Sequence, residues 1–282
     1  MNILFLGGDL RQKYASDYLN KYKYTAKALI EFDINNVKDD LEKSDVIALP
    51  LPCSNDGIHL NMLKKSDSAV IITDILETVK NGTVIIGGKL TQKVRELALN
   101  KGLETVDYMD IEPFQIQNAL LSAEGAIYYG KQKLERSIHG ANVVIFGCGR
   151  IGKILAYLLN SQGANVTVIA RRDIDLTWSR LIGYDTLKIP RNRVSLKTPP
   201  DIIFNTIPCQ IIDEKFLDLL DKNTIVVDLA SFPYGIDEDL IKKYNINYYR
   251  ELGIPGRYAP QSAGEIIGKT IIDYVLTKED WH

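Results

Sequence analysis

The stretch of sequence that decides the fold is Val143-Val144-Ile145-Phe146-Gly147-Cys148-Gly149-Arg150-Ile151-Gly152. It is a short apolar run that leads into the pattern G-x-G-x-x-G. A buried strand that enters such a glycine turn, followed by a helix, presents backbone N–H groups and a helix N-terminus to a pyrophosphate. The pattern therefore predicts a dinucleotide site, whose expected cofactor-binding residues are Gly147, Gly149, Arg150, Ile151 and Gly152.

The residues around the glycine turn complete a strand–helix–strand unit. Residues 153–159 carry apolar side chains at helical spacing, Gly163 marks the end of that helix, and residues 165–170 are rich in β-branched side chains. Such a unit needs roughly 30 residues, which is about the length available here. The first glycine is expected to form the tight turn, the second to let the backbone approach the phosphates, and the third to let the helix pack close to the strand. The alternative is that the glycines only tighten a turn.

The end of the second strand indicates which dinucleotide binds. An NAD site usually has Asp or Glu at this point, on the ribose 2′-hydroxyl. Here the chain reads Ala170-Arg171-Arg172-Asp173, and a forked, permanently charged guanidinium suits a 2′-phosphate. We therefore expect NADP rather than NAD, with Arg171 and Arg172 as cofactor-binding residues. Two alternatives stay open: the arginines are solvated surface charges, or a one-residue shift brings Asp173 to the ribose of NAD.

Composition excludes several other classes of protein. The chain has 282 residues, 45% of them hydrophobic and 25% charged, which is the normal balance of a soluble globular protein with room for two domains. A net charge of −2 suggests neither a nucleic-acid partner nor an anionic membrane surface, and no apolar run approaches the roughly 20 residues of a membrane span. The first residues lead into a strand without a signal peptide, and three distant cysteines fit a reduced cytosol, so we expect a cytoplasmic protein. Because neither C-x-x-C nor H-x-x-x-H occurs, we expect no metal site.

Strands and helices alternate along the first half of the chain. The turn at residues 7–11 resembles a nucleotide turn but lacks G-x-G-x-x-G. Alternation of this kind predicts a parallel sheet with helices on both faces, here without a dinucleotide. The expected strands are residues 2–6, 45–49, 68–73, 83–86 and 104–107, and the expected helices are residues 56–63 and 91–100.

We predict an α/β chain of two doubly wound parallel-sheet domains joined by a long helix. The second domain is the Rossmann dinucleotide-binding domain, and a C-terminal amphipathic helix crosses back to pack on the first. The expected domains are an N-terminal substrate domain at residues 1–120, completed by residues 263–282, an interdomain helix at residues 121–138 and an NADP-binding domain at residues 139–262. The expected strands of the second domain are residues 143–146, 166–170, 202–206, 225–229 and 246–249.

Five strand ends carry loops rich in glycine, proline and polar residues. In folds of this class ligands bind beyond the carboxyl ends of the strands, so these loops are expected to line a cleft. Taken singly, each loop is equally well explained as a turn. The loops are residues 49–57, 87–91, 205–208, 228–233 and 253–264.

Motifs along the whole chain give it a family resemblance. They are Gly-Gly-Asp-x-Arg-Gln at 7–12, Ser-Ala-Glu-Gly-Ala at 122–126, the glycine pattern at 147–152, Asn-Thr-Ile-Pro at 205–208, Asp-Leu-Ala-Ser at 228–231 and Pro-Gly-Arg-Tyr-Ala-Pro-Gln-Ser-Ala-Gly at 255–264. In this combination and order the chain resembles the A subunit of dipicolinate synthase. The wider architecture is similar to the formate/glycerate dehydrogenase and adenosylhomocysteinase group, in which a substrate domain and a Rossmann domain close on a shared cleft.

The resemblance implies a function and partners. Members of that family belong to endospore-forming bacteria and work with the flavoprotein-like B subunit of dipicolinate synthase to oxidise a dihydrodipicolinate to dipicolinate with NAD(P). The resemblance thus implies an oxidoreductase of sporulation, located in the mother cell and assembled with that B subunit. We also expect the chain to form a homo-oligomer.

A dicarboxylate substrate calls for cations at fixed spacing and for a proton acceptor. Arg11, Lys89 and Arg257 lie in the candidate loops and are the expected substrate-binding cations, although a surface role is equally open for each. Glu124, taken to lie at the start of the interdomain helix, and Asp9 are the candidate catalytic bases; either could instead be a helix-terminus charge or a hydrogen-bond anchor. The residues that resemble the backbone shelf under the nicotinamide of Rossmann dehydrogenases are Thr206, Pro208, Ala230 and Ser231, the last also counted as substrate-binding.

Two rival functions are weighed against this interpretation. A D-2-hydroxyacid dehydrogenase needs a histidine base paired with a carboxylate, and none of His59, His139 and His282 lies in the late second-domain loop where that histidine belongs. This rival is therefore disfavoured. The second rival is a non-catalytic, regulatory NADP-binding polypeptide whose partner carries out catalysis, which the resemblance keeps open because it implies a second polypeptide.

Overall fold

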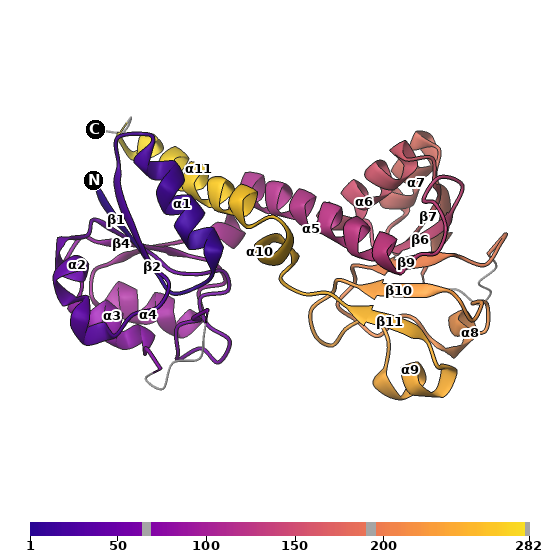
Figure 1. The fold of residues 1–282 in the computed structure, drawn as a ribbon, viewed down its shortest axis with the longest axis horizontal. Helices are drawn as coiled ribbons and strands as arrows, with labels where there is room; N and C mark the ends of the chain where they lie inside the picture. Colours follow the sequence, from indigo (N-terminus) through magenta and orange to yellow (C-terminus); the bar gives the residue numbers. More distant parts are fainter. Residues whose placement is uncertain (64–68, 190–195, 280–282) are drawn as a thin grey trace. The chain divides into compact units, whose positions relative to one another are not determined.

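Two parallel sheets organise the chain, one in each of two compact units (Figure 1). Unit 1 comprises Met1–Asn118 and Pro255–His282, and unit 2 comprises Ala119–Ile254. The first domain is thus built from both ends of the chain. The boundaries expected from the sequence fall after residues 120 and 262.

The computed structural model describes residues 1–63, 69–189 and 196–279. The elements before the long helix are β1 (Asn2–Leu6), α1 (Leu10–Asn20), β2 (Thr25–Leu29), η1 (Ile34–Asn36), α2 (Lys38–Lys43), β3 (Val46–Ala48), α3 (Ile72–Thr78), β4 (Val84–Gly87), α4 (Gln92–Asn100), β5 (Glu104–Asp107) and η2 (Tyr108–Asp110). The elements from the long helix onward are α5 (Glu112–Lys133), β6 (Asn142–Phe146), α6 (Arg150–Ser161), β7 (Asn165–Ala170), α7 (Asp173–Ile182), β8 (Asp185–Lys188), β9 (Ile202–Asn205), α8 (Glu214–Leu217), β10 (Ile225–Asp228), α9 (Glu238–Tyr244), β11 (Asn247–Arg250), α10 (Ile254–Tyr258) and α11 (Pro260–Glu279).

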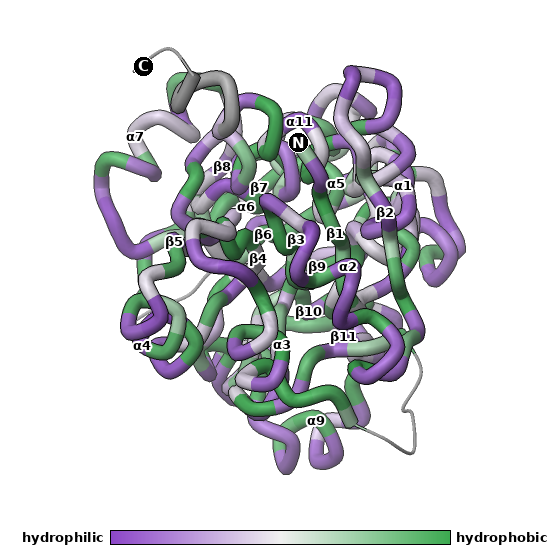
Figure 2. The backbone as a smooth tube through the Cα atoms, turned by 90° about the vertical axis from the view of Figure 1, so that its left-hand side faces the viewer, coloured by the Kyte–Doolittle hydropathy of each residue, from purple (hydrophilic) through white to green (hydrophobic). Residues whose placement is uncertain are grey.

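The sheet of unit 1 has the strand order β2-β1-β3-β4-β5, and its neighbouring strands are parallel. Successive residues of β1 alternate between two hydrophobic clusters: Ile3 and Phe5 belong to one, Leu4 and Leu6 to the other. Most of β1 is accordingly drawn in green, the colour of hydrophobic residues (Figure 2). The order reverses between β1 and β3, which is where such sheets place a ligand crevice.

The sheet of unit 2 has the order β11-β10-β9-β6-β7-β8 and is likewise parallel. Numbered from the glycine-turn strand, this is the 3-2-1-4-5-6 order of the Rossmann fold, with its switch point between β6 and β9. Buried residues such as Ile145, Phe204 and Val227 make its central strands apolar on both faces. The predicted fold class, two doubly wound parallel sheets, is therefore confirmed.

Helix α5 carries the chain from unit 1 into unit 2 and lies earlier in the sequence than predicted. It ends at Lys133 instead of continuing to residue 138, and further along the Ser137 hydroxyl accepts a hydrogen bond from the His139 N–H, a local contact typical of a turn. Since α5 begins at Glu112, Glu124 lies near the middle of the helix, and its expected place at the helix start is wrong. Neither α5 nor any other helix in the described residues is long and apolar enough to cross a membrane.

The C-terminal helix α11 packs on α1 within unit 1, as the sequence predicts. Two glycines make the approach possible: a Cβ on Gly264 would lie 2.5 Å from the Arg11 carbonyl oxygen, and one on Gly268 would lie 2.8 Å from the Tyr18 ring. The helix begins three residues before the expected start at residue 263, and residues 280–282 lie outside the described part. The two ends of the chain are thereby joined in one domain.

Residues 56–63 are expected to form a helix, and this prediction is wrong. The N–H groups of Leu60 and Asn61 donate instead to the carbonyls of Val70 and Cys53, so long-range bonds replace the helical ones. The following chain then pairs with it, since the N–H of Ile72 donates to the carbonyl of Ile58. The strand expected at residues 68–73 is also wrong where it is described, because α3 begins at Ile72; residues 64–68 lie outside the described part.

Substitution of Gly264 by alanine should destabilise the protein. The added methyl group would meet the backbone of α1, which cannot move away as a flexible side chain could. We expect the free energy of unfolding to fall by about 1–3 kcal/mol, measured by urea denaturation. Lys269→Ala, at an exposed position of the same helix, is the matched control and should change it by less than about 0.5 kcal/mol. Equal stability of the two variants would contradict the close packing of α11 on α1.

Candidate functional site

The three glycines of the turn between β6 and α6 each meet a different steric requirement. Gly147 has a φ of 102°, and a Cβ there would lie 2.2 Å from the Thr206 hydroxyl oxygen. A Cβ on Gly152 would lie 2.2 Å from the Gly147 carbonyl oxygen, whereas one on Gly149 would meet nothing within 4 Å. Gly149 is the N-cap of α6 and provides no side-chain hydrogen bond, so the first turn keeps its N–H groups open. This arrangement fits a pyrophosphate.

Asp228 organises the edge of the sheet next to that turn. Its fully buried carboxylate accepts hydrogen bonds at Oδ1 from the N–H of Ala230 and the Asn205 amide, and at Oδ2 from the N–H of Gly235 and the Tyr248 hydroxyl. Burial and the neighbouring carboxylate raise the pKa of Tyr248, which therefore stays a donor. A buried charge with four donors is a rigid anchor. The Asp-Leu-Ala-Ser motif is visible in the sequence but this role is not, since three of the donors come from other parts of the chain.

The predicted shelf residues lie on the loops that this network holds. Ala230 is buried, Thr206 is half-buried, and Ser231 and Pro208 are exposed. The Thr206 hydroxyl donates to the Phe146 carbonyl at 2.8 Å, so it ties the loop after β9 to the glycine turn. The structure thus brings these four residues to the same sheet edge as the glycine turn, within unit 2.

The charges at the end of β7 are paired unequally. Nε and Nη2 of Arg172 bind the two carboxylate oxygens of Asp175 at 2.7 and 2.8 Å, and this ion pair raises the pKa of Arg172. Asp173 accepts a hydrogen bond from the Lys188 ammonium. Among the described residues Arg171 has no hydrogen bond or ion pair. The paired carboxylates leave Arg171 as the cation available to a ligand at this strand end.

In unit 1, Asp9 and Arg11 form a rigid pair after β1. Nε and Nη2 of Arg11 bind the Asp9 carboxylate at 2.8 Å each, and Nη2 also donates to the Leu51 carbonyl at 2.7 Å. Asp9 caps α1 as well, since it accepts the N–H of Arg11. A Cβ on Gly256 would lie 2.8 Å from the Asp9 carboxylate, which brings the next residue, Arg257, to the same edge. In the described structure Asp9 is an anchor for Arg11; its role as a base stays a prediction.

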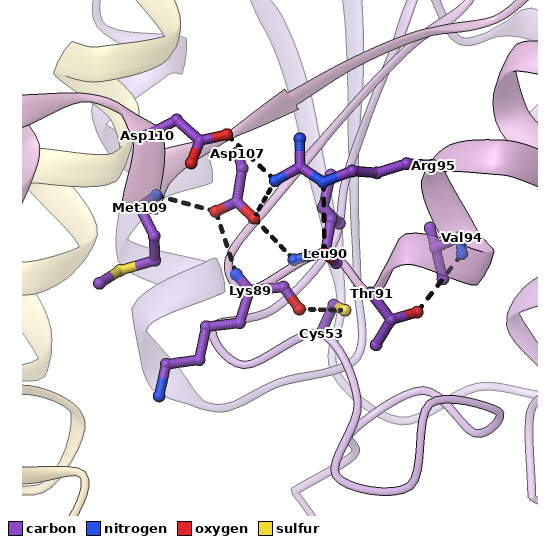
Figure 3. Close-up of polar contacts among 9 residues, drawn as sticks. All are labelled: Cys53, Lys89, Leu90, Thr91, Val94, Arg95, Asp107, Met109 and Asp110. Atoms are coloured by element: carbon purple, nitrogen blue, oxygen red, sulfur yellow. Dashed lines mark hydrogen bonds and ion pairs between the residues drawn. The ribbon is translucent and has the colours of Figure 1, made fainter. Parts of the chain in front are cut away.

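Lys89 follows β4 at the same edge and has a φ of 55°, in the left-handed region. The carboxylate of Asp107 fixes the loop around it, because it accepts hydrogen bonds from the N–H groups of Lys89, Leu90 and Met109 and an ion pair from Arg95 (Figure 3). Asp107 is 4% exposed. The only sign of this contact in the sequence is an acidic residue at a strand end, since its partners are up to 18 residues away.

The structure therefore brings most of the predicted site residues together in two groups. The first group occupies the carboxyl edge of the unit 1 sheet, beside the switch point between β1 and β3. The second occupies the carboxyl edge of the unit 2 sheet, beside the switch point between β6 and β9. Glu124 is an exposed residue near the middle of α5. The unit 1 group is Asp9, Arg11, Lys89 and Arg257, and the unit 2 group is the glycine turn with Arg171, Arg172, Thr206, Pro208, Ala230 and Ser231.

The histidines serve other purposes where they are described. His59 lies in unit 1 and its Nδ1 is 2.6 Å from the Asp56 carboxylate, a contact that lowers the pKa of Asp56. His139 packs against Gly163, where a Cβ would lie 2.2 Å from its ring nitrogen. His282 lies outside the described residues. In the described part of the chain, no group of three His, Cys, Asp or Glu residues could hold a metal ion.

Comparison with known proteins connects this geometry to a family. The family model of the N-terminal domain of the dipicolinate synthase A subunit matches residues 2–109. The dipicolinate synthase A subunit of Bacillus subtilis (strain 168) is 26% identical over 96% of this chain and 94% of its own length. The resemblance to the family of dipicolinate synthase A subunits is confirmed. In addition, the ketopantoate reductase PanE/ApbA family model matches residues 143–230, which contain the glycine turn.

Solved structures agree with the fold. The A subunit of dipicolinate synthase from Bacillus halodurans is 25% identical with a TM-score of 0.79, covering 97% of both chains. The A chain of dipicolinate synthase from Bacillus subtilis, at 24% identity, has a TM-score of 0.84 and covers 100% of this chain and 98% of that one. A D-lactate dehydrogenase from Sporolactobacillus is similar in fold at 14% identity, with a TM-score of 0.66 over 98% of this chain and 95% of that one. The architecture is thus that of the dehydrogenases.

The three cysteines should differ in reactivity. Burial raises the pKa of the Cys53 and Cys148 thiols, which keeps them protonated, whereas Cys209 is exposed. We expect one thiol per chain to react rapidly with Ellman's reagent in the native protein at about pH 8, and three after denaturation. Cys209→Ser should abolish the rapid phase. A second rapid thiol in that variant would show that the glycine turn or the loop after β3 is open to solvent.

Proposed function

We propose that the chain is the component of dipicolinate synthase that oxidises dihydrodipicolinate to dipicolinate with NADP. The family resemblance over nearly the whole chain supports the reaction, and the dehydrogenase fold supports a nicotinamide cofactor. The single observation that carries the cofactor site is the glycine turn, where a side chain is blocked at Gly147 and Gly152 but free space remains at Gly149.

The charges after β7 support NADP over NAD. Of the nearby carboxylates that could bind the ribose hydroxyls of NAD, Asp175 binds Arg172 through both oxygens and Asp173 binds Lys188 through one. Arg171 has no such partner in the described part of the chain. A guanidinium free of competing carboxylates is a suitable donor to a 2′-phosphate, and the neighbouring Arg172 adds a second positive charge.

The oxidation removes a hydride from one ring carbon of the dihydropyridine and a proton from another ring atom, and yields the aromatic dicarboxylate, a reduced cofactor and a released proton. When bound, the nicotinamide accepts the hydride. The protein itself has to hold the two substrate carboxylates, orient the ring and accept the proton. We propose that Arg11, Lys89 and Arg257 hold the carboxylates and that Ser231 helps to orient the ring. Glu124 is the preferred base, since both oxygens of Asp9 bind Arg11.

The family resemblance also supports a place in the cell. We propose that the chain acts with the B subunit of the synthase in the mother cell of a sporulating bacterium, as a homo-oligomer that joins a hetero-oligomer. One observation favours the alternative of an NADP-binding regulatory component: within unit 1, the acidic residue beside the cations is already bound to Arg11. In that case a partner would supply the proton acceptor.

Arg171→Ala should weaken NADP much more than NAD. Loss of a charge-assisted hydrogen bond to a phosphate corresponds to roughly 1.5–3 kcal/mol, or about 10–150-fold in the NADP dissociation constant. NAD affinity, which lacks that phosphate, should change by less than about threefold. Isothermal titration with both oxidised cofactors measures the two constants.

Arg172→Ala is the matched control for this cofactor prediction. Because Asp175 already holds two of its donor nitrogens, this variant should lose less NADP affinity than Arg171→Ala. If both arginine variants lost NADP and NAD affinity equally, the NADP assignment would be wrong.

Arg11→Ala should raise the KM for dihydrodipicolinate by about tenfold or more and leave NADP affinity unchanged, because Arg11 lies in unit 1 and the glycine turn in unit 2. The assay follows NADPH absorbance with the chain alone and with the B subunit of the synthase. Lys13→Ala, an exposed neighbour on α1, is the control and should leave KM unchanged. Cofactor binding without turnover in any mixture would overturn the enzymatic function.

A further inference from the structure

Lys89 occupies a backbone conformation that its side chain disfavours. With a φ of 55° its Cβ crowds the backbone, a cost that glycine does not have. The two preceding residues are Gly87 and Gly88, so the chain uses glycine freely in this loop but not at this position. A left-handed residue that is not glycine is a reason to test its side chain for a functional role.

The surroundings that hold Lys89 are rigid. Oδ1 of Asp107 accepts the N–H of Lys89 at 3.0 Å, and Oδ2 accepts the N–H of Leu90 at 2.7 Å. Nη2 of Arg95 binds Oδ2 at 2.8 Å and so compensates the buried charge. In Figure 3 the Lys89 side chain extends away from this carboxylate. Within the described residues its ammonium has no hydrogen bond or ion pair.

Lys89 and Arg11 flank the same short loop after β3. On one side, the N–H of Gly88 donates to the Pro50 carbonyl at 3.1 Å, and a Cβ on Gly88 would lie 2.2 Å from the Leu51 side chain. On the other side, Arg11 donates to the Leu51 carbonyl at 2.7 Å. The backbone just before Lys89 and the guanidinium of Arg11 therefore both contact residues 50–52, at the switch point of the sheet.

We propose that Lys89 binds one carboxylate of a dianion and that Asp107 and Arg95 are positioning residues that act through it. Arg11, fixed by Asp9, binds the other carboxylate. The strained backbone fixes the origin of the long lysine side chain, which lowers the entropy lost when the ammonium binds. The inference rests on the proposed function for the identity of the dianion, a pyridine dicarboxylate.

The decisive variant is Lys89→Gly in the full-length chain, and the probe is pyridine-2,6-dicarboxylate, titrated calorimetrically. Its dissociation constant should rise about tenfold or more, because a charge-assisted contact is lost. The thermal midpoint should not fall, because relief of the left-handed strain offsets the greater freedom of glycine in the unfolded chain. If Lys89 had a merely structural role, Lys89→Gly would lower the thermal midpoint and leave the dissociation constant unchanged.

Lys23→Gly is the matched control. Lys23 is also exposed and has a φ of 67°, but it lies between α1 and β2, away from the loops after β1, β3 and β4. It should show the same response of the thermal midpoint and no change in dicarboxylate affinity. NADP affinity should be unchanged in both lysine variants, because the glycine turn belongs to unit 2.

A double-mutant cycle tests the positioning role of Asp107. Asp107→Asn should weaken dicarboxylate binding several-fold when Lys89 is present and not at all in the Lys89→Gly background. If Asp107→Asn does not fold, Arg95→Met removes the ion pair alone and takes its place in the cycle. Equal losses in both backgrounds would show that the contacts of Asp107 with Arg95 and the loop, together called the Asp107 clamp, stabilise the domain without acting through Lys89. That result would overturn this part of the proposal.

These measurements distinguish failure of the role of Lys89 from failure of the proposed function. If the unmodified chain binds the dicarboxylate and Lys89→Gly binds it within about twofold, the role of Lys89 is wrong while the proposed function stands. If the unmodified chain binds NADP but no dicarboxylate, the proposed substrate is wrong, and the role of Lys89 falls with it.

Discussion

A buried carboxylate at the end of a strand holds the functional loops in each half of this protein. Asp107 ends β5 and gathers the N–H groups of the loop that contains Lys89; Asp228 ends β10 and gathers those of the loop that contains Ala230. Parallel strands end at one edge, where loops leave the sheet and lose their ladder partners. A carboxylate there satisfies several N–H groups at once. The other features of both candidate sites depend on loops fixed in this way.

The pairing of charges decides which cations of the two candidate sites are left without a carboxylate. Asp9 binds Arg11 and Asp175 binds Arg172, so each acid orients a guanidinium and occupies one of its edges. In the described chain, Arg171 and Lys89 remain without a carboxylate. Under the proposed function, a bound carboxylate or phosphate would meet two guanidiniums, those of Arg11 and Arg172, whose directions are already set, and it would compete with no protein carboxylate at Arg171 and Lys89. Fixed donors of this kind reduce the reorganisation that binding requires.

The sequence predicted those structural features whose signals lie in neighbouring residues. The apolar runs of β1 and β6, the tight turn at Gly147 and the close packing at Gly152 followed from residue order alone, because strand pairing and close backbone approach leave direct signs there. The edge strands β2 and β8 were missed, since their residues are more polar and half-exposed. The helix expected at residues 56–63 failed because the N–H groups of Leu60 and Asn61 bond to the distant carbonyls of Val70 and Cys53. The clamps of Asp107 and Asp228 could not be predicted, because they join residues distant in sequence.

Under the proposed function, the two switch-point sites would divide the tasks of a dehydrogenase in a way that follows from their chemistry. A dinucleotide needs many backbone donors and close approach, which glycines at a strand–helix turn provide. A small dianion instead needs few contacts of high charge, and long side chains can supply them only if their origins are fixed. The pair of Asp9 with Arg11 and the clamp of Asp107 on Lys89 fix those origins by different means, one by an ion pair and the other through the backbone. Unit 1 thus has the doubly wound fold with anchored cations in place of a glycine turn.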